Sequence, residues 1–252
     1  VDRAREAELS KKVPELPNEG WKPSDVDAGR IALDADKALG SVQGALAETN
    51  VALSGPDGKG ESKCQMMIRD SKTYALEYVL LEHGLPNRYL AKGDGKRRAV
   101  LLPAAFNRKG SWAKSAPNGP GSMSASALVE RWPLEFPRLA LAPLVDPKPA
   151  FGPYVLALQK GVGGYSVKTE KREMSFQGHL VTSYRITATR AAGKGGPAKI
   201  EMVFDANYHL PVTIRTSSPG KKGKNQELLW TAGWQFGRTF NNDSFDVPSK
   251  LN

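Results

Sequence analysis

Apolar and polar residues alternate along much of the second half of the chain, and this alternation predicts β-strands. In residues 200–216, IEMVFDANYHLPVTIRT, apolar side chains take every second position on both sides of a polar turn, which predicts a hairpin. Residues 178–190 and 226–240 alternate in the same way. The three segments are therefore expected to be antiparallel strands that place large apolar side chains on one face.

The first half continues the pattern after a single helix. Residues 28–39 carry apolar side chains at helical spacing, with Ser24 as the expected N-cap. From residue 60 the pattern changes to strands, which we expect at residues 61–70, 72–82 and 87–104, with a turn at the GDGK segment. Residues 1–24 are polar and interrupted by proline, so we expect a flexible N-terminal arm followed by one domain at 25–252.

A different pattern occupies residues 123–145, where apolar side chains lie on more than one side and prolines interrupt any long helix. We expect two or three short helical turns that cover a face of the sheet as a lid. The candidate lid residues are Leu128, Trp132, Leu134 and Phe136.

Composition is that of an ordinary globular domain, with 252 residues, 40% hydrophobic and 25% charged. The net charge of +10 is compatible with nucleic acid, anionic lipid or an acidic partner. The basic residues gather at 92–98, 190–199 and 220–224, between strands, which favours solvated turns over an anionic-surface footprint. The aromatic residues alternate with Leu and Ile rather than with Lys and Arg, so nucleic acid is not expected as a partner.

Candidate catalytic chemistry is sparse. The sequence holds neither a phosphate-loop motif nor a nucleophile elbow, and its three histidines, His83, His179 and His209, are far apart. Cys64 is the single cysteine and alternates with apolar residues, which indicates a buried thiol. We therefore expect no catalytic residues, no metal site, no cofactor and no enzyme activity.

The sequence contains many large apolar side chains that recur on one face of successive predicted strands. If the strands are neighbours, these side chains form a wall that needs a cover, because burying each contributes about 1.5–3 kcal/mol. A curved sheet with few helices can enclose a ligand cavity, and the alternative is a solidly packed core. The wall residues, which are also the candidate ligand-binding residues, are Tyr74, Leu76, Tyr78, Tyr184, Ile186, Met202, Phe204, Trp230 and Trp234.

The order of these elements resembles the superfamily of the outer-membrane lipoprotein carrier LolA and its receptor LolB. The matching features are short: Asp205 followed by Leu210 and Pro211 between two strands, a polar turn with a phenylalanine at 241–245, and the DGK of the early hairpin. The resemblance implies an α+β fold in which a strongly curved antiparallel sheet, an unclosed barrel, wraps around the N-terminal helix and a short helical lid. It also implies an apolar cavity for acyl chains and no enzyme activity.

The leading functional hypothesis is an extracytoplasmic, periplasmic binder of lipid or lipoprotein acyl chains. The chain begins at Val1 without a leader, which we expect to reflect removal of a signal or anchor. The alternative is an envelope-associated sensor or scaffold that binds a protein partner or an anionic surface through its basic loops. Peripheral membrane contact fits both hypotheses, and a monomer is expected.

Overall fold

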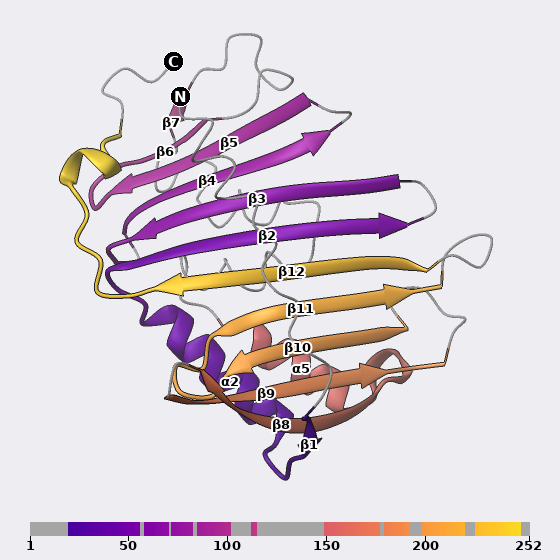
Figure 1. Cartoon of the computed structure of the whole chain (residues 1–252). Coiled ribbons are helices and arrows are strands. Elements are labelled where there is room, and N and C mark those ends of the chain that lie inside the picture. The colour runs from indigo at the N-terminus through magenta and orange to yellow at the C-terminus, as the bar shows by residue number, and fades with distance from the viewer. Residues whose placement is uncertain are drawn as a thin grey trace.

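The computed structural model describes residues 20–55, 58–70, 72–82, 85–101, 112–114, 149–176, 179–191, 198–219 and 225–247. Within these residues twelve strands form one sheet in the order β1-β8-β9-β10-β11-β12-β2-β3-β4-β5-β6-β7 (Figure 1). Every pair of neighbours is antiparallel. The strands at the two ends of this order, β1 and β7, do not pair with each other, so the barrel stays unclosed, as predicted.

The elements follow the predicted order of one helix, a first group of strands, and a second group of strands. A second helix, α5, precedes the second group. The bounds are β1 Lys22–Pro23, α2 Ala28–Gly40, β2 Ala45–Gly55, β3 Gly58–Ile68, β4 Thr73–Glu82, β5 Leu85–Asp94, β6 Arg98–Leu101, β7 Trp112–Lys114, α5 Phe151–Gln159, β8 Ser166–Phe176, β9 His179–Thr189, β10 Lys199–Asp205, β11 Pro211–Ser218 and β12 Gln226–Gln235, with the 3-10 turns η1 Val162–Gly164 and η3 Asn242–Phe245.

The hairpin predicted at residues 200–216 is confirmed as β10 and β11, in which Met202 pairs with Ile214. The carboxylate of Asp205 accepts hydrogen bonds from the backbone N–H groups of Asn207 and Tyr208, at 2.9 and 2.7 Å. A short side chain that bonds the backbone two and three residues ahead stabilises a turn. Asp205 therefore ends β10 and stabilises the turn that follows it.

Helix α2 begins one turn later than the capping prediction assumed. Asp27, not Ser24, is the N-cap, and its carboxylate accepts a hydrogen bond from the N–H of Arg30 at 2.9 Å. The Ser24 hydroxyl instead accepts from the N–H of Val26. The apolar side chains then recur every three or four residues on the buried side, as the spacing predicted.

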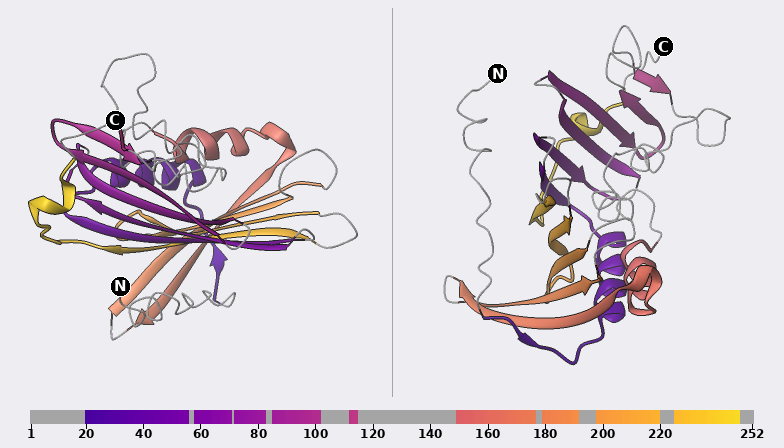
Figure 2. Two further views of the ribbon diagram at one scale, coloured as in Figure 1. Left: turned by 90° about the horizontal axis from the view of Figure 1, so that it is seen from above. Right: turned by 90° about the vertical axis from the view of Figure 1, so that its right-hand side faces the viewer.

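Both helices lie on the same face of the sheet, and the strands β8 and β9 curve beneath them (Figure 2). This concave face carries the main hydrophobic core, to which α2, α5 and eight of the described strands contribute. Among the described residues, the helices are not long and apolar enough to cross a membrane. The core therefore forms between the helix pair and the sheet, as the α+β prediction required.

Residues 20–24, the described end of the predicted N-terminal arm, lie at the β8 edge of the sheet. Lys22 and Pro23 pair with β8, and Trp21 stacks against the guanidinium groups of Arg172 and Arg185, at 4.7 and 4.5 Å from the ring centroid. The described end of the predicted arm, residues 20–24, is thus attached to the sheet. The lid predicted at 123–145 falls outside the described residues.

Candidate ligand-binding face

The strand register places all nine predicted wall residues on the concave face. Met202 pairs with Ile186 on one side and with Ile214 on the other, and Ile214 pairs with Trp230. The same face continues across β2 and β3 to β4, where Met66 pairs with Leu76. The alternating pattern predicted which side chains share a face of each strand, and the strand order and register bring those faces together.

Six of the nine side chains are completely covered. The side chain of Tyr78 lies outside the described part of the structure, and those of Tyr184 and Trp234 are partly buried. The ring of Phe151, in α5, meets the ring of Phe204 edge to face at 5.5 Å. The wall is covered by protein along this part of the sheet, and its covered members are Tyr74, Leu76, Ile186, Met202, Phe204 and Trp230.

The helix pair α2–α5 is the described cover, and polar bonds join its two ends. The buried carboxylate of Asp36 accepts hydrogen bonds from the N–H groups of Ala150, Phe151 and Gly152 at 2.7–2.9 Å, which caps α5. At the other end the side-chain amide of Gln159 donates to Asp27 at 2.7 Å. That bond, with the backbone bond from Arg30, lowers the pKa of Asp27.

Close approach of the two helices depends on glycine. A Cβ on Gly29 would lie 2.6 Å from Leu156, and a Cβ on Gly152 would lie 2.5 Å from Leu33. The sequence analysis predicted no helix at residues 151–159, although Phe151, Val155 and Leu158 are buried at helical spacing. That spacing was the available evidence for α5. Pro153 obscured it, but proline is tolerated in the first turn of a helix.

Solvent exposure rises along the wall toward one end of the sheet. Along β12 it increases from the buried Trp230 through the partly buried Trp234 to Phe236, which is 41% exposed. Along β9 it increases from the buried Ile186 to Leu180, which is 64% exposed. The β9 and β12 ends lie on the same side because the strands between them are antiparallel.

An aromatic pair marks this end of the sheet. Tyr208, at the tip of the β10–β11 hairpin and 62% exposed, stacks on Phe236 with a centroid distance of 5.3 Å. Next to it the indole N–H of Trp234 donates to the carbonyl oxygen of Pro211 at 2.9 Å. We call the following group the rim: Leu180, Tyr184, Tyr208, Trp234 and Phe236.

The indole of Trp230 differs from that of Trp234 in one respect. Trp230 lies at the middle of the sheet, and its Nε1–H is buried with no hydrogen-bond acceptor among the described residues. A buried N–H without an acceptor costs about 1–3 kcal/mol. A ligand that placed a hydrogen-bond acceptor beside the Trp230 N–H would therefore remove this cost.

Other predicted features have plain structural roles. Cys64 is buried in the core, as predicted, and this burial raises the pKa of its thiol. In the basic turn at 92–98 Arg97 pairs with Asp94 at 2.9 Å. The other two basic loops lie largely outside the described residues. Within the described ranges no cluster of His, Cys, Asp or Glu side chains is arranged to hold a metal ion.

Comparisons with known proteins find similar structures at low identity. No protein-family model matches the sequence, and a comparison with curated proteins finds no match. Solved structures similar to the chain include the MucA/MucB complex from Pseudomonas aeruginosa, with a TM-score of 0.38 and 9% identity over 90% of this chain and 63% of that one. The chain thus spans less than two thirds of that relative's length.

Two further solved structures align with this chain over almost their whole length. A LolA superfamily protein from Nitrosomonas europaea has a TM-score of 0.31 and 12% identity, covering 88% of this chain and 98% of that one. LprF from Mycobacterium bovis has a TM-score of 0.38 and 13% identity, covering 90% and 99%. The LolA superfamily, which the sequence motifs resemble, is therefore represented among the solved structures to which this chain is similar.

Proposed function

We propose that the protein is a non-enzymatic, extracytoplasmic binder of lipid or lipoprotein acyl chains, which it holds against the apolar wall. The observation that supports this proposal is the rise in exposure from Trp230 to the rim. Along β12 this surface begins in solvent and continues into the core through Phe236, Trp234, Ala232 and Trp230 without a polar side chain, which is the shape that an acyl chain requires.

Binding would be driven by removal of the acyl chain from water. Each methylene that is buried contributes about 0.8 kcal/mol. The acyl chain would pass between the rim and the helix pair. The two helices would move together, because hydrogen bonds from Asp36 and Gln159 join them. The N–H of Trp230 would then donate to an ester or amide carbonyl oxygen of the ligand, and so gain the acceptor it lacks within the described residues.

A binding role fits the chemistry of the wall better than catalysis does. The nine wall residues include no serine, cysteine, histidine or carboxylate from which a nucleophile–base pair is usually built, and their polar groups are two indoles and three phenols. We therefore assign shielding of the acyl chain, and not its cleavage, to this face.

Quenching of tryptophan fluorescence by doxyl-labelled stearic acid tests the proposal. We expect quenching in the native protein, and weaker quenching in the Trp234→Phe variant because that indole lies beside the proposed path. The double variant Tyr208→Ser/Phe236→Ser should bind about tenfold more weakly, equivalent to about 1.4 kcal/mol of lost apolar contact. Native mass spectrometry after mild extraction should also show copurified lipid.

Val162→Ser is the matched control, because Val162 is 61% exposed on η1 and does not belong to the rim. Its affinity should equal that of the native protein. If a folded sample neither carries lipid nor responds to doxyl-stearate, the acyl-binding proposal is wrong. The sensor or scaffold alternative would instead be supported if charge reversal at Lys221, Lys222 and Lys224 abolished partner capture while lipid assays stayed blank.

A further inference from the structure

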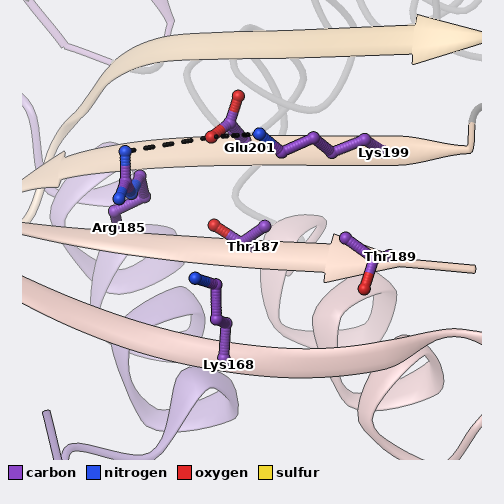
Figure 3. A pocket seen from close by; sticks show the side chains of 6 residues that line it. All are labelled: Lys168, Arg185, Thr187, Thr189, Lys199 and Glu201. Atoms are coloured by element: carbon purple, nitrogen blue, oxygen red, sulfur yellow. Dashed lines mark ion pairs between the residues drawn. The ribbon is translucent and has the colours of Figure 1, made fainter. Parts of the chain in front are cut away.

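The convex face of the sheet, opposite the wall, contains an open hollow of about 350 Å³ over β8, β9 and β10 (Figure 3). Its side chains come from three adjacent strands, and Arg185 and Lys199 point toward Glu201, while the hydroxyl of Thr189 is turned away. Three are cationic, two are threonines and one is acidic. The lining residues are Lys168, Arg185, Thr187, Thr189, Lys199 and Glu201.

Thr187 lies at the centre of this arrangement. The register pairs it with Lys168 on one side and with Glu201 on the other, while Arg185 and Thr189 flank it along its own strand. Thr187 is only 2% exposed, and its hydroxyl has no hydrogen-bond partner among the described residues. A buried hydroxyl with no partner is costly, so its position at the floor of a polar hollow indicates a missing acceptor.

Arg185 is the fixed cation of the hollow. Its guanidinium donates to Glu170 through Nε at 2.9 Å and through a terminal nitrogen at 2.8 Å, lies 3.9 Å from Glu201, and stacks on Trp21. These contacts hold the side chain in place at 13% exposure. A pre-positioned guanidinium is well suited to bind an oxyanion, because little side-chain entropy is lost on binding.

The two lysines are held less firmly. Lys168 pairs with Glu170 at 3.2 Å and Lys199 with Glu201 at 3.0 Å, and their side chains are 62% and 47% exposed. Solvent-exposed ion pairs contribute little, so either ammonium group can turn toward a ligand at small cost.

Positive charge exceeds negative charge around the hollow. Arg215 is the register partner of Glu201 on the same face, which adds a cation on the β11 side. On the β8 side, burial and the nearby charge of Arg185 lower the pKa of Arg172. Without counting these two arginines, Lys168, Arg185 and Lys199 carry three positive charges against the two negative charges of Glu170 and Glu201, so an additional anion would be favoured here.

We propose that this hollow binds a phosphate group, with Arg185 and Thr187 as its fixed donors and Lys168 and Lys199 as its movable ones. The phosphate group belongs either to a small soluble phosphomonoester or to an anionic lipid headgroup at a membrane surface. This site is separate from the apolar wall, and it stands or falls independently of acyl binding.

A purely structural ion-pair lattice is the competing explanation. Such a lattice accounts for Arg185, Lys168 and Lys199, because each already has a carboxylate partner. It does not account for a buried threonine hydroxyl aimed into the same hollow, where valine would fill the same volume without the polar cost.

The experiment measures binding of two probes at constant ionic strength. Isothermal titration with glycerol 3-phosphate tests the soluble source, and flotation with phosphatidylcholine vesicles, with and without phosphatidic acid, tests the headgroup source. The variants are Thr187→Val and the double variant Lys168→Gln/Lys199→Gln. The matched control is Lys37→Gln/Lys72→Gln, which removes the same charge from exposed positions elsewhere on the described surface.

We expect the native protein to bind at least one probe. The Lys168→Gln/Lys199→Gln variant should bind about tenfold more weakly and Thr187→Val several-fold more weakly, since each loses donors to the phosphate. The control should be unchanged. Thr187→Val should also melt at the native temperature or above it, because it loses a hydroxyl that has no partner; this shows that its weaker binding is not a folding defect.

The pattern across the two probes identifies the source. Titration of glycerol 3-phosphate supports a soluble ligand, and capture only by phosphatidic acid vesicles supports a lipid headgroup. The proposal is overturned if neither probe binds, or if the hollow variants and the control lose binding equally, since that result would reflect net charge alone.

Discussion

Ile186 and Thr187 are consecutive residues of β9, and both are buried, yet they lie on opposite faces of the sheet. Ile186 belongs to the apolar core beneath the helix pair. Thr187 lies among charged side chains in the hollow of the convex face. The comparison shows that similar burial has two different energetic origins in this protein: apolar packing on the concave face, and a charged network on the convex face.

The largest expected effect comes from opening the concave face. Phe204→Ala should lower the free energy of unfolding by about 3–5 kcal/mol, because it removes the edge-to-face contact with Phe151 and leaves a cavity. Urea denaturation followed by circular dichroism measures this loss.

Val203→Ala is the matched control, since Val203 is buried on the opposite face next to Phe204. It removes fewer atoms and should cost clearly less. Equal losses for the two variants would mean that the faces do not differ in the way described.

The next effect concerns the bond between the helices that cover the wall. Asp36→Ala should cost about 2 kcal/mol, because three backbone N–H groups at the start of α5 lose their acceptor. Thermal unfolding measures the change. Asp34→Ala, on the exposed side of the same helix, should change stability much less; an equal loss would contradict the capping role of Asp36.

The smallest effect lies on the convex face and depends on pH. Burial opposes ionisation of Glu170, but hydrogen bonds and charges from Lys168 and Arg185 outweigh it and hold the pKa of Glu170 below its usual value. A carboxylate with a lowered folded-state pKa stabilises the protein above its unfolded pKa of about 4.3, and that stabilisation disappears as the pH falls through the folded pKa.

Glu170→Gln should therefore cost about 1 kcal/mol near neutral pH and almost nothing in strong acid. Urea midpoints of the native protein and the variant, compared across the acid range, test this convergence. Glu173→Gln serves as control, because that carboxylate is exposed and pairs only with Lys171 among the bonds described, so its effect should be smaller. A loss that stays constant with pH would show that the Glu170 charge is not its cause.

Much of the fold could be predicted because strand alternation is a local property. The hairpin of β10 and β11 and the shared face of Ile186, Met202 and Trp230 follow from a period of two residues. Helix α5 was missed because it is short and begins with glycine and proline. Its stability comes from a cap supplied by Asp36, more than a hundred residues earlier in the chain.

The candidate sites were predictable to different degrees. The wall residues were identified from their pattern, whereas the rim depends on Tyr208 at a hairpin tip meeting Phe236 at the end of β12. The convex hollow was not identified from the sequence. In β9 and β10 its polar residues alternate with apolar ones, in β8 charged residues follow one another, and nothing in a single strand shows which cation faces which carboxylate.

The sequence by itself determined which side chains share a face and that the concave face needs a cover. Tertiary structure alone decided what covers it and which charges meet on the other side. The physical reason is that alternation is set by backbone geometry within one strand, whereas Asp36 capping α5, or Arg185 between Glu170 and Glu201, depends on contacts between distant segments.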